Sequence, residues 1–89
     1  MNKQAPQTKA TDAAAKLISL SGDFAARLYY NDGANTVYLG IDGTVTATGA
    51  TKGYPLAPGK EFYDPSKNST YGVCAAGQAS SIIVFAVSL

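Results

Sequence analysis

GYPLAPGKEFYD, residues 53–64, places two prolines and two glycines in its first seven residues and then continues as an alternating, strand-like segment. Proline fixes φ near about −65° and has no N–H to donate, so Pro55 and Pro58 cannot join a sheet ladder. The stretch therefore predicts a rigid corner that carries the chain from one β-sheet to the other, with Tyr54 and Leu56 anchoring it to the core. The residues expected to form this corner are Tyr54, Pro55, Leu56, Pro58 and Gly59.

Two further stretches show the period of two that is typical of β-strands. In FAARLYY, residues 24–30, Leu28 and Tyr30 share one face and Arg27 lies on the other, which predicts a half-buried strand. The last strand is expected in SIIVFAVSL, residues 81–89, which is apolar on both faces. Only one of these faces can meet the core of a thin sandwich, so the other should be covered by the N-terminal segment or by a neighbouring subunit. The residues expected at that subunit interface are Ile83, Phe85 and Val87.

Asp-Gly dipeptides mark two turns between the predicted strands. NDGAN, residues 31–35, contains an Asp-Gly pair that suits positive φ, and we expect TVYLG, residues 36–40, to return as the second arm of a hairpin. IDGTVTAT, residues 41–48, repeats the pattern and is expected to form another short strand. If the two turns shared one end of a sandwich, Asp32 and Asp42 could form a glycosidase pair or a calcium site. Because Asp-Gly is so common in tight turns, we expect only turns here.

Seven short strand candidates separated by glycine-rich turns predict an all-β protein, a small antiparallel β-sandwich or barrel. DAAAKLISL, residues 12–20, has enough alanine for a short helix, but it is too short to be stable alone and we favour a strand. Residues 1–12 offer almost nothing to bury and predict a flexible or extended arm that only a partner would order. The expected organisation is this arm followed by one β-sandwich domain, residues 13–89.

The composition limits the kinds of partner that the chain can have. It has 89 residues, of which 46% are hydrophobic and 15% charged, so one domain with few surface charges is expected and self-association is favoured. The seven basic residues are scattered and form no stripe for nucleic acid. The longest apolar run, residues 82–87, is far shorter than the ~20 residues that span a bilayer, and no export signal is visible. We therefore expect neither nucleic acid nor a membrane as a partner.

The sequence offers little material for catalysis. It contains no histidine, which is the usual general base and the commonest metal ligand. Its single cysteine, Cys74, excludes an internal disulfide and is expected to be a small core side chain. We therefore expect no enzyme activity, no metal and no cofactor. Six tyrosines suggest a function of another class, a glycan-binding module in which Tyr29, Tyr54 or Tyr63 stacks on a sugar ring.

Three segments carry a resemblance to a known family: RLYYNDGANTVYLG at 27–40, GYPLAPGKEFYD at 53–64, and YGVCAAG at 71–77 followed by the hydrophobic C-terminal strand. They resemble a small β domain of the virion proteins of tailed bacteriophages. In that family a strand ending in Asn leads through a Gly-x-Asn-x-Val-Tyr hairpin and a Gly-x-Pro-Leu-x-Pro-Gly corner to a valine-rich last strand. The resemblance covers roughly residues 24–87. The family's last strand usually alternates valine with polar residues, and this chain departs from that pattern at Ile83, Phe85 and Val87.

The resemblance implies a structural role, because such domains serve as capsid decoration or cement proteins, head fibres and tail modules. A lone domain with an arm is similar to a decoration protein, which would bind the major capsid protein on the outer surface of the assembled head and stabilise it. The protein would be made in the host cytoplasm, located on the virion and self-associated, with a trimer favoured. A tail, neck or fibre-associated component is the structural alternative. The arm residues expected to contact the capsid are Gln4, Pro6, Thr8 and Lys9.

Overall fold

The computed structural model of the protein describes residues 3–4, 8–12, 15–18, 24–65 and 69–88. These residues form an all-β fold with one short 3-10 helix, which confirms the predicted fold class. The elements are β1 (Lys3–Gln4), β2 (Thr8–Thr11), β3 (Lys16–Leu17), β4 (Phe24–Asn31), β5 (Val37–Gly40), η1 (Gly49–Thr51), β6 (Tyr54–Leu56), β7 (Glu61–Asp64), β8 (Tyr71–Val73) and β9 (Ala79–Ser88).

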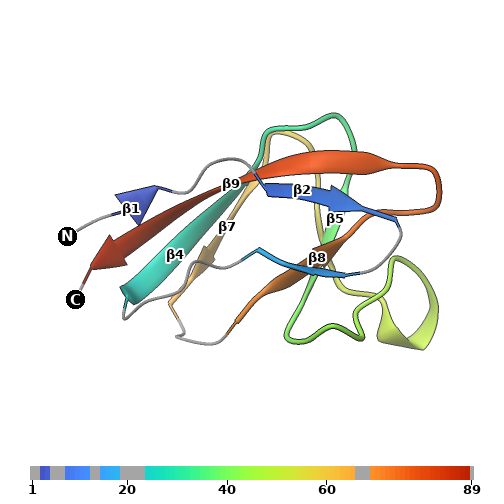
Figure 1. The fold of residues 1–89 in the computed structure, drawn as a ribbon, viewed down its shortest axis with the longest axis horizontal. Helices are drawn as coiled ribbons and strands as arrows, with labels where there is room; N and C mark the ends of the chain where they lie inside the picture. Colours follow the sequence, from blue (N-terminus) through green and yellow to red (C-terminus); the bar gives the residue numbers. More distant parts are fainter. Residues whose placement is uncertain (1–2, 5–7, 13–14, 19–23, 66–68, 89) are drawn as a thin grey trace.

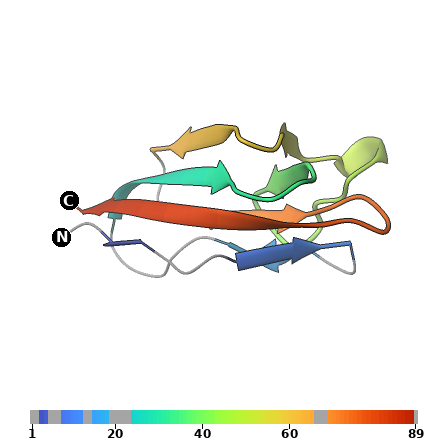
Figure 2. The same ribbon diagram turned by 90° about the horizontal axis from the view of Figure 1, so that it is seen from above.

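The described strands form two antiparallel sheets (Figure 1). The larger sheet has five strands in the order β1-β9-β4-β7, with β2 also paired to β9. Figure 2 shows these strands side by side, from gold β7 through teal β4 and red β9 to the blue N-terminal strands. The smaller sheet has the order β3-β8-β5-β6. The long strand β9 is therefore an interior strand, with β4 along one edge and β1 and β2 along the other.

The core lies between the two sheets and takes side chains from both. Tyr29, Ile82 and Val84 contribute from the larger sheet, and Val37 and Leu56 contribute from the smaller one. Each is fully buried, and burial of a side chain of this size stabilises the fold by about 1.5–3 kcal/mol. The predicted alternation of the last strand is confirmed, because the even-numbered residues of β9 from 80 to 86 all face the core.

The hairpin predicted around NDGAN is absent, and this expectation was wrong. β4 pairs with β7 and β9 in the larger sheet, whereas β5 pairs with β6 and β8 in the smaller sheet. Residues 32–36 therefore cross between the sheets. Gly33 does not have positive φ; it lies against β9, where a side chain at this position would collide with the backbone of Ser80 and Ser81. The glycine is needed for close approach and not for turn geometry.

The strand predicted at residues 41–48 is also absent. The segment makes a single bridge, from Thr46 to Lys52. Its turn is held instead by Asp42, whose carboxylate accepts hydrogen bonds from Thr44 N at 2.9 Å and from the Thr44 hydroxyl. These bonds lower the pKa of the Asp42 carboxyl below its usual value. Local bonds of this kind offer the backbone an alternative to a sheet ladder, which is why β-branched residues did not produce a strand here.

The proline-rich corner connects the sheets as its sequence predicts. Residues 57–60 lead from β6 in the smaller sheet to β7 in the larger one. Gly59, with a φ of 76°, supplies the positive φ of the turn. Two details differ from expectation. Pro55 does lie in a strand, opposite Tyr38, which is possible because β6 is the edge strand of its sheet. Leu56 is buried in the core, but Tyr54 is largely exposed and does not anchor the corner there.

The described part of the N-terminal segment is paired along β9 of its own chain. β1 and β2 occupy the edge of β9 that β4 leaves free, and Ala10 is fully buried. Asp12 accepts a hydrogen bond from Gly77 N at 2.7 Å, in the turn before β9. This corrects the expectation that only a partner would order the segment. The strand favoured for residues 12–20 is present as the two-residue β3.

Cys74 follows β8 and is buried, as expected for a core side chain. Its Sγ lies 3.6 Å from Ala10 O, which joins β2 to the segment after β8. Burial raises the pKa of the Cys74 thiol, with a smaller contribution from the nearby Asp12 carboxylate. The thiol is therefore kept neutral and serves packing.

Candidate functional site

The orientation of β4 places its charged and its apolar residues on unexpected sides of the sheet. Arg27 and Tyr29 are buried and face the interior together with Asn31. Leu28 and Tyr30 alternate with them and face outward, where Tyr30 is exposed. The strand therefore turns a charged side chain inward and large apolar side chains outward.

The neighbouring strands continue this outward apolar surface. In the register of the larger sheet, Phe85 of β9 lies opposite Leu28, and Ile83 lies opposite Tyr30. On the other side of β4, Tyr63 of β7 also lies opposite Leu28. Phe85 remains 38% exposed on this face. We call this surface the outer patch, and its members are Leu28, Tyr30, Tyr63, Ile83 and Phe85.

The residues predicted for the subunit interface lie on β9, which borders β4, the central strand of this patch. Ile83 and Phe85 are members of it, and Val87 lies opposite Ala26 farther along the same pair of strands. Sequence reasoning missed Leu28, Tyr30 and Tyr63, although the alternation in residues 24–30 had already placed the first two on one face. The centre of a protein interface is typically rich in aromatic and apolar side chains and poor in charged ones, as this patch is.

The arm residues predicted to contact a capsid lie at one edge of the larger sheet. Gln4 is opposite Phe85, next to the outer patch. Thr8 and Lys9 are opposite Ile82 and Ser81, farther along β9. Pro6 lies outside the described residues. The described arm residues therefore pair along β9, the strand that carries the predicted subunit contacts.

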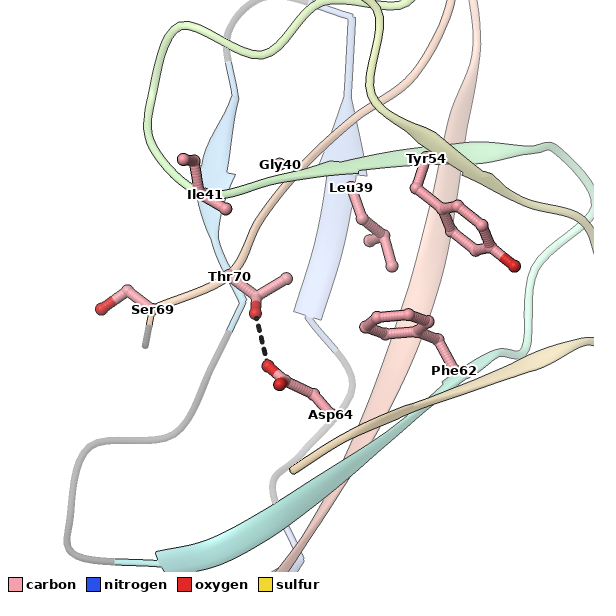
Figure 3. Close-up of a pocket in the computed structure, with 8 residues that line it drawn as sticks. All are labelled: Leu39, Gly40, Ile41, Tyr54, Phe62, Asp64, Ser69 and Thr70. Carbon is pink, nitrogen blue, oxygen red and sulfur yellow. Dashed lines mark hydrogen bonds between the residues drawn. The ribbon is translucent and has the colours of Figure 1, made fainter. Parts of the chain in front are cut away.

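A cavity of about 220 Å³ opens between the two sheets, at the edge opposite the N-terminal strands (Figure 3). The ring centroids of Tyr54 and Phe62 lie 5.3 Å apart along its wall. Figure 3 shows the Asp64 carboxylate and the Thr70 hydroxyl turned toward each other, with a hydrogen bond of 3.3 Å from Thr70 Oγ1 to Asp64 Oδ2. The residues that line the cavity are Leu39, Gly40, Ile41, Tyr54, Phe62, Asp64, Ser69 and Thr70.

The sequence contains a signal for the part of this cavity that β7 forms. Alternation in KEFYD places Phe62 and Asp64 on the same side of β7, opposite to Tyr63. Of the tyrosines proposed to stack on a sugar, Tyr54 borders the cavity, Tyr63 belongs to the outer patch, and Tyr29 is fully buried. Tyr29 therefore has no surface to offer a ligand.

The described residues do not form the metal site or the carboxylate pair considered for Asp32 and Asp42. Among them, no group of three or more His, Cys, Asp and Glu side chains is placed to hold a metal ion. Asp32 precedes β5 and Asp42 follows it, so these carboxylates lie at opposite ends of that strand and do not share one end of the sandwich. The described residues also include no helix that is long and apolar enough to cross a membrane.

No protein-family model, curated protein or solved structure matches the chain.

Proposed function

We propose that the protein is a non-enzymatic structural component of a phage virion, a capsid decoration protein that self-associates and binds the outer surface of the assembled head. The observation that supports this role is the outer patch. An apolar face in a chain of only 89 residues leaves much of its hydrophobic surface in water unless another molecule covers it. The phage assignment itself rests on the resemblance of the corner and the flanking strands to virion domains.

Such a protein would act by binding energy alone. A ligand that binds the assembled shell but not its free subunits stabilises the shell by mass action. Self-association multiplies the contacts that one decoration unit makes with the shell, which raises its overall affinity without any new kind of contact. The outer patch would hold the copies together, and the N-terminal strands at the edge of the same sheet would face the major capsid protein.

The first prediction concerns self-association. Native mass spectrometry over a range of concentrations should show an oligomer, with a trimer favoured. Phe85→Asp should weaken association on the order of 100-fold, because it removes an aromatic anchor and would bury an unpaired charge. Leu17→Asp is the matched control: Leu17 is 49% exposed, but lies on the smaller sheet, so the oligomer should persist. A wild-type protein that is monomeric at every concentration would remove the support that the outer patch gives to this role.

The second prediction concerns the capsid. The wild-type protein should co-sediment with phage heads from which this protein is missing. The Lys9→Glu variant should occupy a smaller fraction of the binding sites on those heads. This substitution keeps the backbone pairing of Lys9 with Ser81. Deleting the arm would be a poor test, because it would expose the edge of β9 and remove the buried Ala10. Lys16→Glu makes the same charge change in the smaller sheet and should bind normally. Protein found on tails and not on heads would favour the tail, neck or fibre alternative.

A further inference from the structure

The cavity between the sheets has an apolar rim that the core does not explain. Ile41 is 83% exposed and Tyr54 is 59% exposed, and both border its opening. The half-buried Phe62 continues the aromatic wall inward from Tyr54. Exposed apolar side chains around a hollow favour docking of another molecule there.

The floor of the cavity is polar, and an arginine lies opposite its carboxylate residue in the sheet register. The buried Asp64 accepts a hydrogen bond from Thr70, and a carboxylate offers about four acceptor sites in all. Arg27 is also buried and lies directly opposite Asp64 in the β4–β7 register, on the same interior face. With Arg27 at this register position, a cationic ligand would gain less here than at an isolated carboxylate. A neutral donor, such as a hydroxyl group, matches the site better.

The size of the cavity suits a ligand of about one ring. Its volume of about 220 Å³ lies below the roughly 300–1,000 Å³ that is usual for pockets holding drug-sized molecules. An aromatic wall suits a ring with an apolar face, and an acceptor on the floor suits a ring with hydroxyl groups. A sugar ring has both features at this size.

We propose that this cavity binds one ring of a neutral sugar, with a C–H face of the ring against Tyr54 and Phe62 and its hydroxyls donating to Asp64. Figure 3 shows the Tyr54 hydroxyl pointing away from Asp64, so the ring of Tyr54 and not its hydroxyl meets the ligand. The cavity and the outer patch lie on opposite faces of β7, because Phe62 faces inward and Tyr63 outward. Sugar binding is therefore compatible with self-association and does not depend on the capsid role.

The test is a titration of the purified, ¹⁵N-labelled protein, followed by NMR. The probes are the methyl glycosides of glucose, galactose and mannose, and N-acetylglucosamine, each added to about 100 mM. At least one should shift the amide signals of Gly40, Ile41 and Thr70 in a saturable way. A ligand this small is expected to have a dissociation constant on the order of millimolar.

Three variants separate the proposed site from adventitious binding. Tyr54→Phe keeps the ring and should bind like the wild type, whereas Tyr54→Ala should weaken binding about tenfold. Tyr63→Ala removes a tyrosine of almost equal exposure, 61%, from the other face of β7 and should leave the titration unchanged. The proposal is overturned if no probe gives saturable shifts at the cavity, or if Tyr54→Ala and Tyr63→Ala behave alike. Because the experiment uses no capsid, its result is independent of the decoration role.

Discussion

Replacement of Asn31 with alanine is expected to lower the free energy of unfolding by about 3–5 kcal/mol. The Asn31 side chain is fully buried at the end of β4 and uses both of its polar atoms. Nδ2 donates to the carbonyls of Asn35 and Leu56, each at 2.8 Å. Oδ1 accepts from Gly33 N at 3.0 Å and from Ser80 Oγ at 2.7 Å.

The size of the effect follows from what this side chain connects. It ties the crossing after β4 to the corner at Leu56 and to β9 at Ser80, so one residue joins three separate segments. Alanine would leave the partner groups without their bonds, and each buried group left unsatisfied costs about 1–3 kcal/mol. A protein of this length has a total stability of roughly 4–13 kcal/mol, so a large share would be lost.

Urea denaturation followed by circular dichroism measures this loss. Asn35→Ala is the matched control, because Asn35 Nδ2 makes one hydrogen bond, to Ala79 O at 2.9 Å, and its loss should cost only about 1 kcal/mol. Asn31→Asp keeps the shape but turns an oxygen toward the carbonyls of Asn35 and Leu56, so it should also destabilise. Equal costs for the Asn31→Ala and Asn35→Ala variants would show that the network does not hold these segments together.

The sequence predicted the strands better than it predicted their surroundings. Alternation located β4, β7 and β9, and the prolines located the corner between the sheets. Alternation shows only that the two faces of a strand differ in polarity, however, and does not show which face is buried. In β4 the face with Arg27 turned inward, where Asp64 lies opposite Arg27 in the neighbouring strand. The residue opposite this buried charge lies 37 positions away along the chain, and no local pattern reports it.

The candidate surfaces were predictable to different degrees. The part of the outer patch on β9 was anticipated from the sequence, since a strand that is apolar on both faces can bury only one of them in a thin sandwich. The cavity was not anticipated, because it joins residues of β5, β6 and β7 with Thr70, which the sequence does not place together. Tyr54 shows the limit most clearly: the same tyrosine that was expected to fill the core stands at the opening of the cavity.

The two Asp-Gly dipeptides illustrate the same limit and lead to a sharp test. Gly33→Ala is expected to lower the free energy of unfolding by about 2–3 kcal/mol, whereas Gly43→Ala should change it by less than about 0.5 kcal/mol. Neither glycine has positive φ, so backbone strain does not distinguish them. A Cβ at position 33 would lie 2.7 Å from Ser81 N and would also strike Ser80, whereas nothing lies within 4 Å of a Cβ at position 43.

The cost at Gly33 arises because the obstacle is backbone in the middle of the fold. To admit a methyl group, residues 80 and 81 of β9 must move away from the crossing, which strains the hydrogen bond from Asp32 N to Ser81 O, 2.9 Å long. The same movement pulls Ser80 Oγ from Asn31 Oδ1, so the Gly33→Ala and Asn31→Ala effects should be less than additive in the double variant. Denaturation of the two single glycine variants and of this double variant measures both expectations. If the Gly33→Ala variant is as stable as the Gly43→Ala variant, β9 can move at Ser80 at little cost in free energy. The contact between residues 32–36 and β9 would then not be tightly packed.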